Sequence, residues 1–128
     1  MPEFQRMSTE ELLNAINAAN PWFVLFYTGS FLDSWDSLNS LEGKNNMINR
    51  IYESFLDVEF KTLKMKTVRT SVNALISIIK GGRTLDALDY VMESKKLISE
   101  YPYVWDEALV LLDDIASGKY DDFPIPLF

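Results

Sequence analysis

The sequence has 128 residues, of which 48% are hydrophobic and 24% charged, and its formal net charge is −7. This is the composition of an ordinary globular chain, and the length fits one domain whose core needs no disulfide or metal to hold it together. Because cysteine and histidine are both absent, thiol redox chemistry and metal binding through either residue are excluded, and we expect no cofactor.

Two features bear on the boundaries of the domain and on its compartment. Residues 1–6 contain Glu-Phe, a dipeptide that a common cloning site encodes, so we interpret them as a cloning-derived or disordered leader and residues 7–128 as a single domain. The lack of cysteine and of a signal-peptide pattern favours a cytoplasmic protein. The longest apolar run, Trp22 to Tyr27, is far below the roughly 20 residues of a membrane helix, so we expect no membrane association.

The charges are distributed unevenly along the chain. Residues 1–57 carry 8 acids and 3 bases, residues 58–84 carry 1 acid and 6 bases, and residues 85–128 carry 10 acids and 3 bases. An acidic exterior makes nucleic acid an unlikely partner, because phosphate binding needs an excess of Lys and Arg. Only the middle segment has the charge to attract an anion, through Lys61, Lys64, Lys66, Arg69, Lys80 and Arg83. We interpret these bases mainly as solvated cations that pair with the acidic ends of the chain.

The first elements have clear boundaries. Ser8 to Glu11 has the Ser-x-x-Glu form of a capping box and predicts a helix from about 8 to 19. Asn20-Pro21 ends this helix, because the residue before a proline is pushed out of the helical region. The aromatic-rich apolar run from Trp22 to Tyr27 then predicts a strand buried on both faces.

The next elements read as two helices and a strand. Residues 31–42 and 45–56 have helical patterns, and Gly43 between them predicts a break. Residues 58–67 are compatible with a strand. Residues 68–80 fit either a helical face or a buried strand that turns at the following glycines, and periodicity alone leaves both readings open.

The C-terminal third is predicted to be helical and then extended. Residues 84–101 read as helix, and residues 104–115 form an amphipathic helix that ends at Gly118. Prolines at 124 and 126 exclude a regular helix in the tail, so we expect residues 119–128 to form an extended strap.

In chain order, these elements resemble a thioredoxin-like domain. Residues 23–27 resemble the central strand of that family, the positions of its redox C-x-x-C motif fall on residues 31–34, and residues 68–83 resemble the segment with its cis-proline, whose position falls on Asn73 or Ala74. The resemblance implies an α/β fold, a three-layer sandwich with a trimmed middle helix and an extra C-terminal helix, and no redox activity. The alternative is a mostly α-helical domain in which residues 68–80 are helical.

A cysteine-free relative of that family would keep its peptide-docking surface. The resemblance implies that this surface consists of Phe31, Leu32, Asp33, Ser34, Trp35, Asn73 and Ala74. Exposed aromatic residues are typical interface anchors. The alternative is that Phe31 and Trp35 pack as core.

A second candidate surface is acidic. It consists of Asp106, Glu107, Asp113, Asp114, Asp121 and Asp122. Paired carboxylates serve catalysis or magnesium binding only where they converge in a pocket, and the proton carrier most common near neutral pH, histidine, is absent. We therefore expect solvated acids and no catalytic or metal-binding residues.

Three functional hypotheses follow. The first is a non-catalytic protein-binding domain, an adaptor, chaperone-like protein or inhibitor, that uses the thioredoxin-like surface. The alternative is an acidic immunity protein, antitoxin or nucleic-acid mimic that neutralises a basic enzyme, because complementary charge speeds association and selects partners. The third is a structural oligomer subunit in which residues 123–128 dock on a neighbouring copy.

Overall fold

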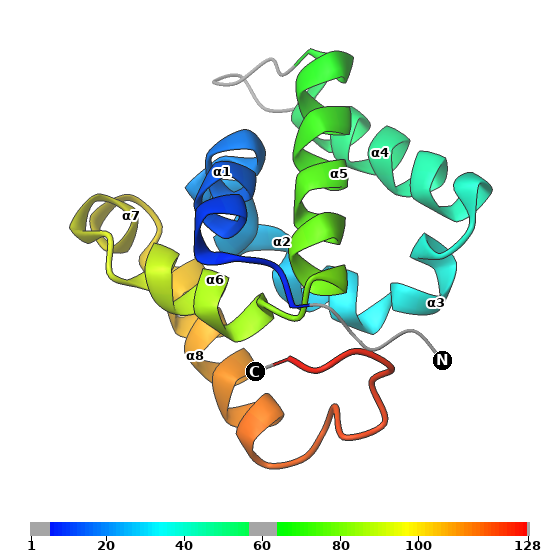
Figure 1. Cartoon of the computed structure of the whole chain (residues 1–128). Helices are drawn as coiled ribbons and strands as arrows, with labels where there is room; N and C mark the ends of the chain where they lie inside the picture. The colour runs from blue at the N-terminus through cyan, green and yellow to red at the C-terminus, as the bar shows by residue number, and fades with distance from the viewer. Residues whose placement is uncertain (1–5, 57–63, 128) are drawn as a thin grey trace.

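A computed structural model describes residues 6–56 and 64–127, and within these ranges the chain forms eight α-helices and no strand (Figure 1). The helices are α1 (Thr9–Ala19), α2 (Pro21–Asp33), α3 (Trp35–Leu38), α4 (Leu41–Leu56), α5 (Met65–Lys80), α6 (Thr84–Met92), α7 (Lys95–Glu100) and α8 (Pro102–Ala116). The prediction of an α/β, thioredoxin-like sandwich is therefore wrong, and the mostly α-helical alternative fits the structure.

The decisive correction concerns the apolar run from Trp22 to Tyr27, which was predicted to be a strand and is the first half of α2. Pro21 occupies the first turn of α2, where a missing N–H costs nothing and the fixed φ suits a helix. Aromatic rings four residues apart then contact each other along the helix, edge to face for Trp22 and Phe26 with centroids 5.8 Å apart, and tilted for Phe23 and Tyr27 with centroids 4.6 Å apart. An unbroken apolar run fits a buried helix as well as a buried strand, so its pattern could not distinguish them.

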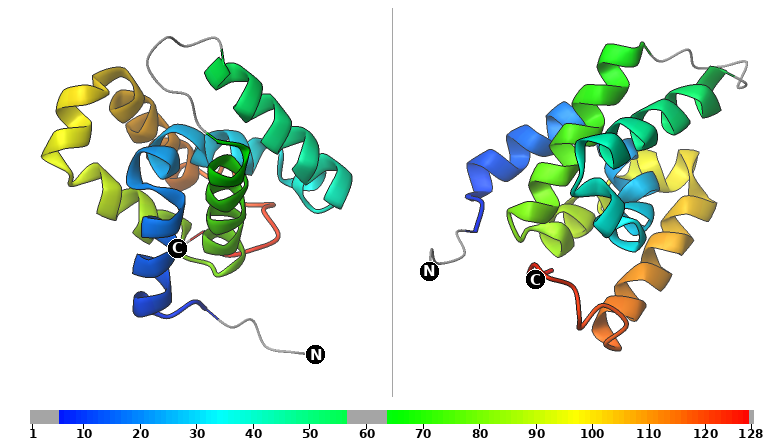
Figure 2. Two further views of the ribbon diagram at one scale, coloured as in Figure 1. Left: turned by 90° about the horizontal axis from the view of Figure 1, so that it is seen from above. Right: turned by 90° about the vertical axis from the view of Figure 1, so that its right-hand side faces the viewer.

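Helix α2 occupies the middle of the bundle. It contacts α1, α5, α6 and α8 (Figure 2). Its buried residues lie on several sides of the helix: Phe23, Val24, Leu25, Thr28, Phe31 and Leu32. The one buried hydroxyl among them is satisfied within the helix, because the Thr28 Oγ1 donates to the Val24 carbonyl at 2.6 Å. The core of the protein is therefore built around α2.

The N-terminal helix forms as predicted. The Ser8 hydroxyl accepts a hydrogen bond from the Glu11 N–H at 3.1 Å and donates one to the Glu11 carboxylate at 2.9 Å. The helix start and the Ser8 N-cap expected from the sequence are confirmed, and Glu11 closes the cap through the Ser8 hydroxyl. Asn20, with φ 78°, ends the helix, and asparagine tolerates a positive φ better than most residues do.

Residues 68–80, for which the sequence allowed either a helix or a strand, form part of helix α5. The cis-proline positions that the resemblance assigned to Asn73 and Ala74 therefore lie inside a regular helix, and the described peptide bonds include no cis bond. The strand expected over residues 58–67 falls largely outside the described residues, and its last three residues begin α5.

The break predicted at Gly43 occurs earlier. The chain turns at Asn39 and Ser40, and Gly43 lies within the first turn of α4. There the Ser40 hydroxyl accepts a hydrogen bond from the Gly43 N–H at 3.0 Å, as a helix cap does. A β-carbon at Gly43 would overlap the Ser37 carbonyl oxygen, so glycine permits the close approach of α4 to α3.

The C-terminal third contains three helices. Residues 84–101, predicted as one helical stretch, divide into α6 and α7, and the Ser94 hydroxyl caps α7 by accepting the Leu97 N–H at 3.3 Å. Helix α8 begins at Pro102 and ends just before Gly118, whose φ of 96° is a conformation that favours glycine.

The tail after α8 packs on its own chain. The Tyr120 hydroxyl donates to the Asp33 carboxylate at 2.7 Å, and the Phe123 ring lies 5.5 Å from the Trp35 ring. Leu127 is buried, and its carbonyl accepts the Leu85 N–H at 2.9 Å. The strap thus covers core residues of α3 and ties the tail to the start of α6.

Hydrogen bonds of Arg83 hold the N-terminal end of the described chain in place. The Arg83 guanidinium donates to the Met7 carbonyl at 2.7 Å and to the Asp86 carboxylate at 2.6 Å, and Arg6 lies 3.1 Å from the same carboxylate. These bonds hold the segment before α1 against the turn between α5 and α6. Among the described helices, none combines the length and apolar character that crossing a bilayer requires.

The burial of Trp35 allows a direct test of the core. Trp35 is only 4% exposed, so Trp35→Ala should lower the free energy of unfolding by about 3 to 5 kcal/mol. Tyr103→Ala is the matched control, because Tyr103 is 83% exposed and its loss should change stability by less than about 0.5 kcal/mol. Urea unfolding followed by circular dichroism measures both, and similar small losses would show that Trp35 is not core.

The bond between Tyr120 and Asp33 predicts a dependence of stability on alkaline pH. Partial burial, followed by the hydrogen bond and the nearby carboxylate charges, raises the pKa of the Tyr120 phenol above its ordinary value of about 10. Above that pH the unfolded chain loses the phenol proton while the folded chain keeps it, so the phenol's contribution to stability falls as pH rises.

As the pH rises from about 9.5 to 11.5, the free energy of unfolding should therefore fall less for the Tyr120→Phe variant than for the unmodified chain. Tyr90→Phe, which removes an exposed phenol and leaves the bond to Asp33 intact, is the control. Urea midpoints measured across this range check the prediction. Identical pH profiles for Tyr120→Phe and the unmodified chain would contradict it.

Candidate functional site

The seven residues predicted from the thioredoxin resemblance do not form one exposed surface. Phe31 and Leu32 are buried in α2, and Trp35 is buried in α3, so the alternative that Phe31 and Trp35 pack as core describes their positions. Asp33 and Ser34 lie where α2 meets α3. The predicted loop does not exist, because α2 continues through the positions at which a strand would have ended.

The second half of the predicted patch lies on another helix. Asn73 is exposed and Ala74 half-buried, both in the middle of α5. Asn73 lines a hollow with residues of α3 and α4, and neither Phe31 nor Trp35 is among the residues that line it. The aromatic part of the patch faces the core and the Asn73 part faces solvent, so they offer no common docking surface.

The acidic residues, in contrast, gather on the outer side of α8. The inner side of this helix contributes Ala108, Leu111 and Ile115 to the core. On the outer side, exposed residues follow one another at intervals of three or four, the spacing of neighbours on a helix. They are Tyr103, Asp106, Glu107, Val110 and Asp113, and we name them the acidic face of α8.

Two members of the acidic face are apolar or aromatic and strongly exposed. Tyr103 is 83% exposed and Val110 is 59% exposed. They lie seven residues apart, with Asp106 and Glu107 between them and Asp113 beyond. Neither side chain belongs to the core cluster of the described residues, so most of its apolar surface meets water.

Within the described part of the chain, Asp106, Glu107 and Asp113 form no ion pair. Residues 102–116 contain four acids and no base. Of the four, only Asp114 forms an ion pair within the described part of the chain, with the Lys119 ammonium 3.4 Å from its carboxylate. Asp121 and Asp122, also predicted for the acidic surface, are exposed in the turns that follow α8. Helix α8 itself therefore contributes only negative side-chain charge to this surface.

Nothing in this arrangement resembles a catalytic centre. Among the described residues, no group of three or more acids converges as metal ligands would. The carboxylates of the acidic face stand on an exposed helix surface, where water solvates them. The chemistry that this surface supports is recognition of a positively charged partner.

Sequence reasoning identified the acids of α8 and missed Tyr103 and Val110. The signal was present, because residues 104, 108, 111 and 115 mark the inner side and place Tyr103 and Val110 opposite it. Single exposed apolar residues are common on protein surfaces, so what distinguishes Tyr103 and Val110 is their place on one helix side with three carboxylates.

The chain matches no protein-family model, and searches of curated proteins and of solved structures find no significant match. Function is therefore inferred from the side chains themselves.

Proposed function

We propose that this protein binds and neutralises a basic partner protein through the acidic face of α8, in the manner of an immunity protein, an antitoxin or a nucleic-acid mimic. The observation that carries this proposal is the pairing of exposed Tyr103 and Val110 with carboxylates that lack ion-pair partners in the described residues. Such a surface combines the two components of a charge-guided interface, which are apolar anchors and a uniform charge.

The apolar component supplies affinity. Tyrosine is enriched among residues that dominate binding energy, because it offers a large contact area and loses little conformational freedom. Tyr103 is nearly fully exposed, and Val110 lies on the same side of the helix two turns away. A partner that covers both would remove apolar surface from water that this chain leaves uncovered.

The charged component supplies speed and selectivity. Asp106 and Glu107 lie between the two anchors, Asp113 lies beyond Val110, and Asp121 and Asp122 extend the acidic region beyond the helix. A surface of one sign attracts a basic partner over distances near the Debye length and repels acidic proteins. The partner that fits is a protein with a cationic surface, such as an enzyme that binds nucleic acid.

The other hypotheses receive less support. An adaptor, chaperone-like or inhibitor function built on Phe31 to Trp35 would need these residues at the surface, and Phe31, Leu32 and Trp35 are buried. A subunit that docks its tail on a neighbouring copy would need a free tail, and Leu127 is buried against its own chain. We further propose a non-enzymatic role, and a cytoplasmic location because cysteine is absent.

The proposal predicts binding that depends on both components. The full chain, immobilised and incubated with extract of its source cells, should retain a basic protein in stoichiometric amount. The variant with Asp106→Asn, Glu107→Gln and Asp113→Asn should lose this protein, because the field that attracts it is removed. With the purified partner, the association rate should fall at least about tenfold from low to high salt. Tyr103→Ala should weaken affinity by about 2 kcal/mol, roughly thirtyfold.

The control removes the same charge elsewhere. Glu10→Gln, Glu42→Gln and Glu53→Gln neutralise three exposed acids on α1 and α4 and should leave capture unchanged. Mass spectrometry of the retained proteins and surface plasmon resonance with the purified partner provide the measurements. A partner that survives the α8 substitutions, or whose binding is indifferent to salt, would refute the proposal.

A further inference from the structure

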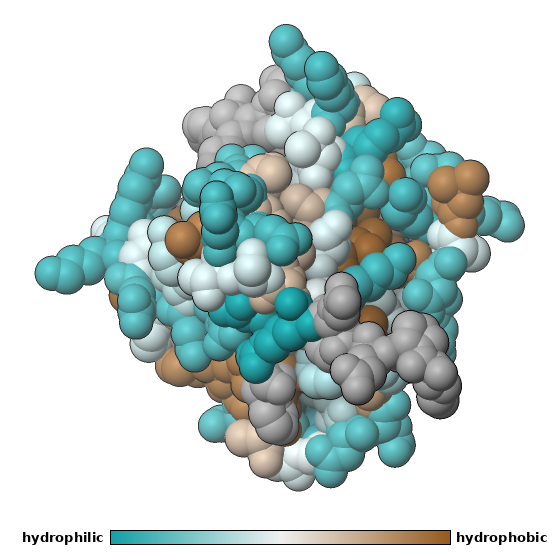
Figure 3. All heavy atoms as spheres, viewed as in Figure 1, coloured by the Kyte–Doolittle hydropathy of each residue, from teal (hydrophilic) through white to brown (hydrophobic). Residues whose placement is uncertain are grey.

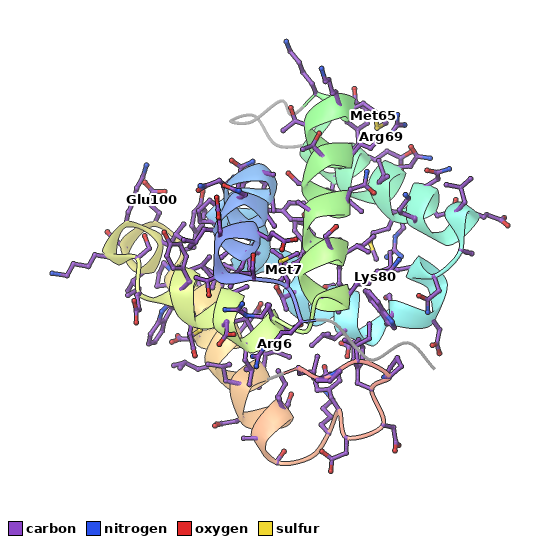
Figure 4. The ribbon with its side chains drawn as sticks, in the orientation of Figure 1. Arg6, Met7, Met65, Arg69, Lys80 and Glu100 are labelled. Carbon is purple, nitrogen blue, oxygen red and sulfur yellow. The ribbon has the colours of Figure 1, made fainter. Side chains whose placement is uncertain are left out.

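A small hollow lies between α3, α4 and α5, on a different part of the molecule from the acidic face. It encloses about 330 Å³. Lys44 of α4 and Lys80 of α5 line it together with Asn73, and Leu38, Leu41 and Ile76 supply its apolar lining. Figure 4 shows Lys80 on the side of α5 toward α3 and α4, and Figure 3 shows hydrophobic residues within the depression between these helices.

The charge of this hollow is opposite to that of the chain. Its lining has two lysines and no carboxylate, although the protein carries a net charge of −7. Neither lysine forms an ion pair within the described part of the chain. Arg83, three residues beyond Lys80, differs in this respect, because Asp86 already neutralises it. The hollow therefore holds two cations that are available to an anion.

The remaining lining adds four polar residues, Asn39, Ser40, Asn73 and Ser77, and an apolar floor. Leu38 and Ile76 are buried side chains at the bottom, and Leu41, 70% exposed, stands at the rim. The Ser77 hydroxyl donates to the Asn73 carbonyl at 3.0 Å, so it is already engaged, whereas the Asn73 side-chain amide is exposed. A ligand would meet two ammonium groups and the side-chain amides of Asn39 and Asn73 above a hydrocarbon surface.

We propose that this hollow binds a small organic anion, in which one carboxylate or phosphate group is attached to a short apolar body. The anionic group would lie between Lys44 and Lys80, and the apolar body would cover Leu38 and Ile76. The volume is at the lower end of the range for small-molecule sites. Two larger hollows nearby are less suited to an anion, because Glu53 and Asp33 line them beside Arg50.

Binding to the full-length, ¹⁵N-labelled chain tests this proposal with four probes: hexanoate, hexyl phosphate, inorganic phosphate and hexanol. Hexanoate or hexyl phosphate should shift amide resonances of α4 and α5 near Lys44 and Lys80 at concentrations up to about 10 mM. Comparing these two distinguishes a carboxylate ligand from a phosphate ester. Hexanol and inorganic phosphate should bind at least about fivefold more weakly, because each lacks one of the two recognised parts.

Variants locate the site. Lys44→Gln and Lys80→Gln should each weaken binding of the organic anion about fivefold, and Lys44→Arg and Lys80→Arg should retain most of it. Lys66→Gln removes one charge from an exposed position on α5 outside the hollow and should change nothing. Thermal melting confirms that each variant is folded. Absence of binding by both organic anions, equal binding of hexanol or inorganic phosphate, or unchanged binding by the Lys44→Gln, Lys80→Gln double variant would overturn the proposal.

Discussion

The structure depends on one requirement, which is that an almost wholly apolar helix must be removed from water. Helix α2 has buried side chains on several sides, so a single neighbouring helix cannot cover it. Helices α1, α5, α6 and α8 together provide the cover. Burial of its large side chains is worth about 1.5 to 3 kcal/mol for each, which makes this covering a large contribution to stability.

Covering α2 also determines which helix faces remain free. Helix α8 buries Ala108, Leu111 and Ile115 in the core. This orientation leaves Tyr103, Val110 and the carboxylates between them at the surface. Helices α5 and α8 both pack against α2. The central helix thus holds apart a helix without acidic residues and a helix without basic ones. The proposed protein-binding face and the proposed anion site are consequences of that separation.

The sequence predicted those elements whose signals are local. The hydrogen bonds of a cap lie within four residues, so Ser8 and Glu11 sufficed to place the start of α1. The outer and inner sides of α8 follow from a periodicity that the helix itself sets. The aromatic run after Pro21 has no such periodicity, because α2 is covered from several directions, and a run of this kind is equally compatible with a strand. That misassignment led to the docking loop at Phe31 to Trp35 and, together with the resemblance of residues 68–83 to the cis-proline segment, to the thioredoxin-like fold.

By itself, the sequence determined the lack of thiol and histidine chemistry, the segregation of charge along the chain, the cap of α1 and the amphipathic character of α8, because each depends on residue types and short spacings. Only the tertiary structure decided that the apolar run is a helix, that Trp35 is core, and that Lys44 and Lys80 line one hollow. These outcomes depend on which elements surround a segment, and contacts between residues far apart in the chain leave no local pattern from which to read them.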